Sequence, residues 1–280
     1  MTRAVVLGGG GPVGIAWESG LLAGLADHGV DLSSADRIVG TSAGSNVGAH
    51  LALGRDLKEA VASRTSNERE DLGGIPSDGI EGLMEVMIQA ASSGKRDEEV
   101  RAEIGRYALS RDTMPEEHFA AYFADLAGAE WPATYSCTAV RATTGEFVVW
   151  DASSRVDLQL AVASSCSVPG LFPPITIGGE RYIDGGMRSA LNADLAEGCV
   201  RAVVVSVMDT SVPGATRPGE LDALRASGTL VELVEPDAAM KEITGGGLFL
   251  MDVGRVPAAY DAGMALAAEL ADRVGPLWNG

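Results

Sequence analysis

The sequence is poor in histidine and cysteine, the side chains on which many catalytic and metal sites depend. It holds three of each among 280 residues, and the cysteines, Cys137, Cys166 and Cys199, are far apart. An odd number of widely separated cysteines supplies neither a disulfide framework nor the ligand spacing of a metal site. We therefore expect a reducing compartment, the cytoplasm, and no bound metal.

Positive charge is also scarce, and so are long apolar runs. The formal net charge is −18, and no run of lysine and arginine occurs. Such an acidic chain is poorly suited to bind nucleic acid or anionic lipid. No stretch is long and apolar enough to span a membrane, and the first residues lack the apolar core and cleavage site of a signal peptide. We expect no nucleic-acid partner and no transmembrane segment, while transient contact with neutral lipid surfaces stays open.

What the sequence does contain is an ordinary globular composition and a β–α–β start. Apolar residues make up 46% and charged residues 21%, and the length suits one large domain with a substantial core. Residues 4–7 and 37–39 are short, apolar, β-branched runs typical of buried parallel strands. Each is followed by a glycine-containing turn and then by a helical pattern, over residues 15–28 and 43–53. This order predicts an α/β fold.

Residues 55–130 have a different character. They carry no strand signal and several amphipathic helical segments, one of which presents Met84 and Met87 on a broad apolar face. We expect a helical insertion, and a candidate lid, within a single domain of residues 1–280. Most of its apolar side chains fit a plain core, and Met84 and Met87 are weak candidates for contact with an acyl chain.

The remaining elements are mostly strands, and the chain ends in helices. Two hairpins, one short helix and one apolar strand are expected before the last two helices. In chain order, the expected segments are strands 133–140 and 147–150, helix 158–163, strands 175–177 and 181–183, strand 201–207, and helices 220–241 and 257–274.

The turn after the second expected strand contains a serine framed by glycines, Gly40-Thr41-Ser42-Ala43-Gly44. A Gly-x-Ser-x-Gly pattern between a strand and a small-residue helix is the context of a nucleophile elbow. The two glycines remove Cβ atoms that would collide with the neighbouring backbone. The helix that follows points its free N–H groups at the serine oxygen. Ser42 is therefore a candidate nucleophile.

None of the three histidines is well placed to activate Ser42. His28 ends a helix, His50 lies about 12 Å further along the helix that follows Ser42, and His118 lies in the insertion. An α/β-hydrolase usually carries its serine, its acid and its histidine in that order along the chain, and no histidine follows His118. A serine hydroxyl needs a base, so a carboxylate must take the proton.

Asp184 is the best carboxylate candidate. It follows the apolar end of an expected strand and precedes Gly185 and Gly186, which let the backbone pack tightly. The simpler alternative is a hairpin turn, because Asp-Gly is a common turn dipeptide. To act as a base, the Asp184 carboxylate needs a poorly solvated site and a direct hydrogen bond to the serine.

A run of glycines, Gly8 to Gly11, follows the first expected strand, and Gly14 lies just beyond it. Backbone N–H groups in this loop can stabilise an oxyanion. The spacing Gly9-x-Gly11-x-x-Gly14 also matches the dinucleotide-binding fingerprint, which needs an acidic residue at the end of the second strand. That strand ends in the Ser42 turn instead, which disfavours nucleotide binding but leaves it as an alternative.

Together these segments resemble the patatin-like phospholipase family. The loop of residues 8–14 looks like that family's oxyanion motif, and residues 40–44 look like its nucleophile motif. Asp184-Gly185-Gly186 looks like the motif that carries the second member of its Ser-Asp dyad, and residues 161–174 resemble the segment before that aspartate. The resemblance implies a three-layer α/β/α fold with a central, mostly parallel sheet. It also implies a serine hydrolase that cleaves lipid or phospholipid acyl esters without metal or cofactor.

The resemblance assigns roles to individual residues. It implies Ser42 as the nucleophile and Asp184 as the proton acceptor. The oxyanion hole would be formed by the amides of Gly9, Gly10 and Gly11. The residues that would support the motifs are Gly14, Gly40, Gly44, Gly185 and Gly186.

Two departures from the family pattern leave other functions open. Val13 stands where the family usually carries arginine or lysine, and the proline often found after the Asp-Gly-Gly motif is missing from residues 188–193. One alternative is therefore a catalytically silent domain of this family that binds a lipid or a partner protein. Another is acyl transfer to an alcohol, which uses the same acyl-enzyme as hydrolysis.

Overall fold

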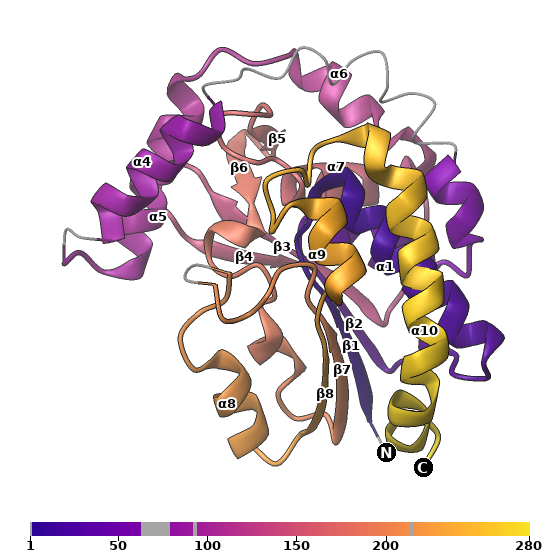
Figure 1. Cartoon of the computed structure of the whole chain (residues 1–280). Helices are drawn as coiled ribbons and strands as arrows, with labels where there is room; N and C mark the ends of the chain where they lie inside the picture. The colour runs from indigo at the N-terminus through magenta and orange to yellow at the C-terminus, as the bar shows by residue number, and fades with distance from the viewer. Residues whose placement is uncertain (1, 63–78, 92–93, 213–214) are drawn as a thin grey trace.

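The computed structural model describes residues 2–62, 79–91, 94–212 and 215–280, and it is built around one eight-stranded sheet (Figure 1). The strand order is β5-β6-β3-β2-β1-β7-β8, and β4 also pairs with β3. The strands are β1 (Arg3–Leu7), β2 (Arg37–Gly40), β3 (Tyr135–Arg141), β4 (Phe147–Trp150), β5 (Ile175–Ile177), β6 (Glu180–Asp184), β7 (Arg201–Val205) and β8 (Leu230–Val234).

The sheet is mixed and mostly parallel. Strands β8, β7, β1, β2 and β3 pair in parallel, whereas β4, β6 and β5 join through antiparallel pairs. The carboxyl ends of β1 and β2 therefore meet at one edge, where the glycine loop and the Ser42 turn begin. The α/β fold predicted from the sequence is confirmed.

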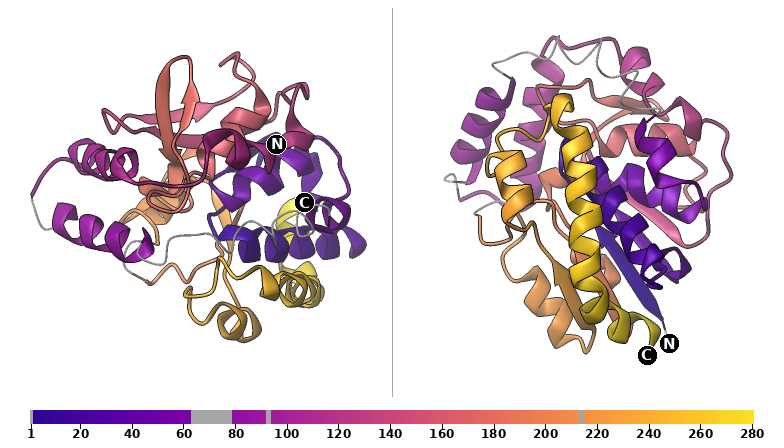
Figure 2. Two further views of the ribbon diagram at one scale, coloured as in Figure 1. Left: turned by 90° about the horizontal axis from the view of Figure 1, so that it is seen from above. Right: turned by 45° about the vertical axis from the view of Figure 1, so that its right-hand side comes forward.

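Helices cover both faces of the sheet, which gives three layers (Figures 1 and 2). The helices packed on one face are α1 (Gly11–Asp27), α2 (Ala43–Ala52), α7 (Leu158–Ser165), α9 (Ala238–Thr244) and α10 (Val256–Asn279). The helices packed on the other face are α4 (Gly79–Ala91), α5 (Asp97–Ser110) and α8 (Glu220–Ala226).

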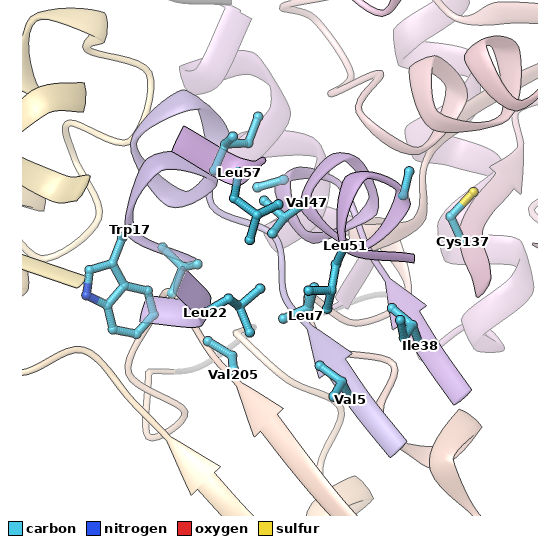
Figure 3. Close-up of a cluster of buried hydrophobic side chains, with 14 of the residues drawn as sticks. Val5, Leu7, Trp17, Leu22, Ile38, Val47, Leu51, Leu57, Cys137 and Val205 are labelled. Atoms are coloured by element: carbon cyan, nitrogen blue, oxygen red, sulfur yellow. The ribbon is translucent and has the colours of Figure 1, made fainter. Parts of the chain in front are cut away.

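Side chains on the two faces of the central strands belong to separate hydrophobic cores. Val5 and Leu7 pack beneath α1 and α2 (Figure 3), whereas Ala4 and Val6 belong to the core beneath α8. Because both faces are covered, β1 is apolar at almost every position rather than alternating. This continuous burial is what makes β1 recognisable from the sequence.

The structure corrects the expected helix over residues 220–241. That stretch is divided into α8, strand β8 and α9, and β8 pairs in parallel with β7. Gly228, with a φ of +95°, follows the end of α8 and turns the chain toward the sheet. The apolar residues of β8 are compatible with a helix face as well as with a strand, and the free edge of β7 decides in favour of the strand.

Helix α1 begins at Gly11, earlier than the Ile15 expected from the sequence. Gly11 has a φ of +60°, and Pro12 occupies the first turn, where a missing N–H costs nothing. The glycine loop is therefore short, and its last residues already form the N-terminus of the helix.

The described part of the expected insertion, residues 55–130, contains helices and no strand. Besides α4 and α5 it holds α6 (Glu116–Ala121) and a 3-10 turn (Ala124–Leu126). Residues 63–78 and 92–93 of the expected insertion lie outside the described residues. Among the helices that the structure describes, none is long and apolar enough to cross a membrane.

Candidate active site

Ser42 occupies a strained turn between β2 and α2. Its φ of +52° lies in the left-handed region, which a residue with a side chain rarely adopts. The turn is held from both sides, because the Ser42 N–H donates to Ser165 Oγ (3.0 Å) and the Ser42 carbonyl accepts from Ser45 Oγ (2.6 Å). Strain of this kind persists only where the surroundings enforce it, and it clusters at functional sites.

The glycines on either side of Ser42 are required by close backbone packing. A Cβ at Gly40 would lie 2.4 Å from the Gly44 carbonyl oxygen, and a Cβ at Gly44 would lie 2.2 Å from the Leu7 carbonyl oxygen. Both distances are far below any real carbon–oxygen contact. The elbow can therefore be this tight only with glycine at both positions.

Asp184 is the last residue of β6 and is buried. Its Oδ1 accepts the Gly186 N–H at 2.7 Å, and its own N–H donates to the Ser167 carbonyl. Its Oδ2 accepts no well-formed hydrogen bond from any described residue. The Oδ1 atom thus holds the Asp-Gly turn that the sequence suggested. The Oδ2 atom is not held by a well-formed hydrogen bond and could accept a proton.

The structure brings the Asp184 carboxyl close to the Ser42 hydroxyl. Burial raises the pKa of Asp184 to about 7, and the Ser42 hydroxyl, followed by the Gly186 N–H, opposes this shift by stabilising the charged form. The two side chains are near neighbours, although they do not form a well-aligned hydrogen bond, as Oδ2 has none. A base with a pKa near neutrality suits removal of a proton at physiological pH.

The glycine loop offers two of the three expected amides. The Gly9 N–H already donates to the Ala190 carbonyl at 2.9 Å, so Gly9 is not available as an oxyanion donor in this structure. Within the described residues, no acceptor is recorded for the amides of Gly10 and Gly11, at the N-terminus of α1. The same holds for the amide of Ala43, the first residue of α2. The sequence-based assignment of Gly9 is therefore corrected.

Ala43 is a candidate donor that sequence reasoning missed. The residue directly after the nucleophile commonly supplies one oxyanion N–H in α/β-hydrolase elbows, so the signal was present in the motif itself. Gly14 lies deeper in α1, where a Cβ would come within 3.2 Å of the Val207 side chain. Its role here is close packing.

Glu18 supports the glycine loop from inside the core. Its Oε1 accepts the Gly8 N–H at 2.9 Å, and burial raises the pKa of this fully buried carboxyl well above its usual range. A buried carboxyl therefore lies beneath the loop. Its only sequence signal is an acidic residue in the middle of a mostly apolar helix.

A small pocket lies beside Ser42 and Ala43. Its wall is mainly apolar and comes from α1, α6 and two loops. The apolar lining residues include Ile15, Phe119, Tyr122, Val168, Phe172 and Met251. Phe119 and Phe172 stack within this wall, with 4.4 Å between their ring centroids.

The expected contact of Met84 and Met87 with this site is wrong. Met84 on α4 is 57% exposed, and Met87 packs against the α4–α5 cluster on the other face of the sheet. Neither residue lines the pocket beside Ser42. The expected insertion does contribute to the pocket wall, but through Phe119 and Tyr122 of the α6 segment.

The geometry disfavours the alternatives that used other residues. Asp31 accepts the Ser33 N–H and Asp36 accepts the Arg3 N–H, so both lie at the amino end of the parallel strands, away from the glycine loop. None of the three histidines, all within described segments, lines the Ser42 pocket. Among the residues that the structure describes, no group of three or more His, Cys, Asp or Glu side chains could hold a metal ion.

Comparison with known proteins gives one family match and several distant relatives. A family model described as patatin-like phospholipase matches residues 5–197. An NTE family protein of Mycobacterium tuberculosis is 26% identical over 244 residues, and one of Mycobacterium bovis is 27% identical over 245 residues; both are named as uncharacterized. Each alignment covers 86% of this chain and 35% of the relative, so the chain spans about a third of the length of these relatives.

Two solved structures show weaker overall similarity. VipD from Legionella pneumophila has a TM-score of 0.36 and 16% identity, and the match covers 66% of this chain and 46% of that one. The type III effector protein ExoU has a TM-score of 0.35 and 15% identity, with 94% of this chain and 53% of that one covered.

Proposed function

This chain belongs to the patatin-like phospholipase family, and on that premise we propose that it hydrolyses lipid or phospholipid acyl esters with Ser42 as nucleophile and Asp184 as base. The observation that carries the proposal is the buried Asp184 carboxyl, which lies close to the Ser42 hydroxyl with no well-formed hydrogen bond at Oδ2, next to the strained Ser42 turn. The apolar pocket beside Ser42 supports an acyl chain as the bound group. The three cysteines are buried free thiols, which supports our further proposal of a reducing compartment.

In the proposed reaction, Ser42 Oγ attacks the ester carbonyl while its proton passes to Asp184 Oδ2. The amides of Gly10, Gly11 and Ala43 donate to the oxyanion that forms. When the tetrahedral intermediate collapses, the alcohol leaves with the proton from Asp184, and the acyl group stays on Ser42. Asp184 then takes a proton from the water that attacks the acyl-enzyme, and returns this proton to Ser42 Oγ as the fatty acid is released.

The first test is covalent labelling with a fluorescent fluorophosphonate, which reacts only with an activated serine. We expect one label per chain in the parent and none in Ser42→Ala. Ser227→Ala, at the end of α8, removes a serine on the other face of the sheet and should label like the parent. Circular dichroism would establish that each variant is folded.

Failure of the folded parent to label would overturn the hydrolase proposal. A domain of this family that binds a lipid or a partner protein without catalysis would then be the better hypothesis. Binding of a fluorescent fatty acid to the apolar pocket, unchanged in Ser42→Ala, would support that alternative.

The rate of labelling is expected to depend on pH through Asp184. Because the pKa of the Asp184 carboxyl is about 7, the ionised base should predominate above that pH and disappear below it. The second-order rate constant for labelling should therefore fall about tenfold per pH unit below pH 7 and level off above it. Measurement between about pH 5 and pH 9 checks this, and a flat profile would contradict the role of Asp184 as base.

A further inference from the structure

Asn192 lies between the turns that carry Ser42 and Asp184. It is completely buried, and its φ of +54° puts it in the left-handed region. Its Nδ2 donates to Thr41 Oγ1 at 3.0 Å and to the Ser189 carbonyl at 2.8 Å. A longer contact of 3.4 Å reaches the Gly185 carbonyl. Thr41 directly precedes Ser42 and Gly185 directly follows Asp184, so one side-chain amide contacts both turns.

The orientation of this amide is fixed by its other end. Arg188 Nη1 donates to Asn192 Oδ1 at 2.7 Å and to Asp194 Oδ1 at 2.9 Å. The Arg188 guanidinium also lies over the Phe147 ring, 4.1 Å from its centroid. A guanidinium only donates hydrogen bonds, so the amide oxygen must face Arg188 and the NH₂ group must face Thr41.

Thr138 of β3 completes the link between the two turns. The Thr138 Oγ1 atom lies 2.9 Å from Thr41 Oγ1. A Cβ at Gly185 would lie 2.1 Å from Thr138 Oγ1. The Gly185 backbone therefore packs directly on Thr138. Thr41, Thr138 and Asn192 are all fully buried, so no water competes for these hydrogen bonds.

We propose that Asn192 is a positioning residue that holds the Thr41 and Gly185 backbones in register, and thereby holds the Ser42 hydroxyl against the Asp184 carboxyl. This inference depends on the proposed hydrolase function. Asn192 itself does not line the Ser42 pocket, so it acts through its neighbours. Because the Ser42 turn is strained, loss of the tether to Thr41 would let the turn relax and separate nucleophile from base. A misplacement of about 1 Å can cost about 100-fold in rate.

The test uses Asn192→Gly, because glycine keeps the left-handed backbone and removes only the side chain. We expect kcat for a fatty acyl ester to fall about 10- to 100-fold with KM almost unchanged, since the apolar pocket is untouched. Fluorophosphonate labelling should slow by a similar factor. Thr41→Val, which replaces the hydroxyl with a methyl group, should likewise lower kcat and leave KM almost unchanged. Thr41→Ser, which keeps the hydroxyl, should keep the rate of the parent.

Two further variants separate positioning from general stability. Asn192→Gly/Thr41→Val should be no slower than the slower single variant, because both changes break the same contact. Thr229→Val also removes a buried hydroxyl bond, to the Cys199 carbonyl, but at the amino end of the parallel strands. It should lower the stability and leave kcat unchanged.

The possible results distinguish failure of the positioning role from failure of the hydrolase proposal. If the parent labels and turns over but Asn192→Gly and Thr41→Val do so equally fast, the positioning role is refuted and the hydrolase stands. A rise in KM with constant kcat, or a loss of kcat in Thr229→Val matching its loss of stability, would also refute it. If the folded parent neither labels nor hydrolyses esters, the hydrolase proposal fails, and the positioning role fails with it.

Discussion

Asp184→Asn is expected to lower kcat for acyl ester hydrolysis about 10³- to 10⁴-fold while KM changes little. Asparagine has nearly the same shape as aspartate and can still accept the Gly186 N–H through its amide oxygen. The NH₂ group that replaces Oδ2 cannot accept a proton from Ser42. Steady-state kinetics with a soluble fatty acyl ester would measure the loss. Residual activity within about tenfold of the parent would mean that another group removes the proton.

The same variant is expected to be more stable than the parent at alkaline pH. The pKa of Asp184 is about 7 in the folded protein, against a value of 3.8 for the unperturbed group. The folded state therefore binds more protons than the unfolded state between these values, and the parent loses stability as pH rises from about 4 to about 7. Above pH 7 the cost of the buried charge reaches about 4 kcal/mol at most, and asparagine removes it.

Urea unfolding at about pH 5 and pH 8 would measure this difference, and the gain of the variant should be larger at pH 8. Asp222→Asn makes the same chemical change at an exposed carboxyl on α8 and should shift stability little at either pH. A variant that is inactive but more stable cannot owe its inactivity to unfolding. Equal stability of Asp184→Asn and the parent at both pH values would contradict the burial cost assigned to this carboxylate.

Gly44→Ala is expected to destabilise the protein by about 3 kcal/mol or more, although alanine is the better helix former. The new Cβ would lie 2.2 Å from the Leu7 carbonyl oxygen and 2.3 Å from its carbonyl carbon. Both belong to the backbone of β1 in the centre of the sheet, so no side-chain rotation can relieve the overlap. The Gly44 N–H also donates to the Gly8 carbonyl at 2.9 Å, so a shift of α2 would pull on the glycine loop.

Gly48→Ala is the matched control, because it makes the same change in the same helix. Its Cβ would meet only side-chain atoms, 3.1 Å from Tyr135 and 3.2 Å from Ile38, and these can move by a few tenths of an ångström. Urea unfolding followed by tryptophan fluorescence should therefore give a clearly smaller loss than Gly44→Ala. Equal losses in the two variants would show that helix α2 tolerates displacement and that the Gly44 contact is not decisive.

The first half of the candidate site could be predicted from the sequence because its signals are local. The strand before Ser42, the two glycines and the small residues after it lie within one short stretch, and tight turns limit which residues can occupy them. Asp184 could also be predicted, because the glycines after it mark a close backbone approach, which the Thr138 contact explains at Gly185. The α/β class followed in the same way from short β-branched runs that alternate with helical patterns.

Elements whose state depends on a distant partner were less predictable. The sequence predicts a helix across strand β8 because its apolar residues fit both periodicities, and only pairing with β7 selects the strand. Met84 and Met87 were weak candidates for the acyl site because their helix is apolar on one side. Met87 packs instead on α5 and the neighbouring strands, whereas Met84 is exposed.

By itself, the sequence determined which residues could serve as nucleophile and base, and that the glycines beside them could not be larger. Only the tertiary structure decided which atoms are available to react. The Gly9 amide is bonded to Ala190, and the Asp184 Oδ2 atom has no well-formed bond. The structure also revealed the buried Glu18 beneath the glycine loop and the Asn192 tether. Burial and hydrogen-bond partners arise between segments far apart in the chain, and these set both the pKa of a carboxylate and the freedom of an amide.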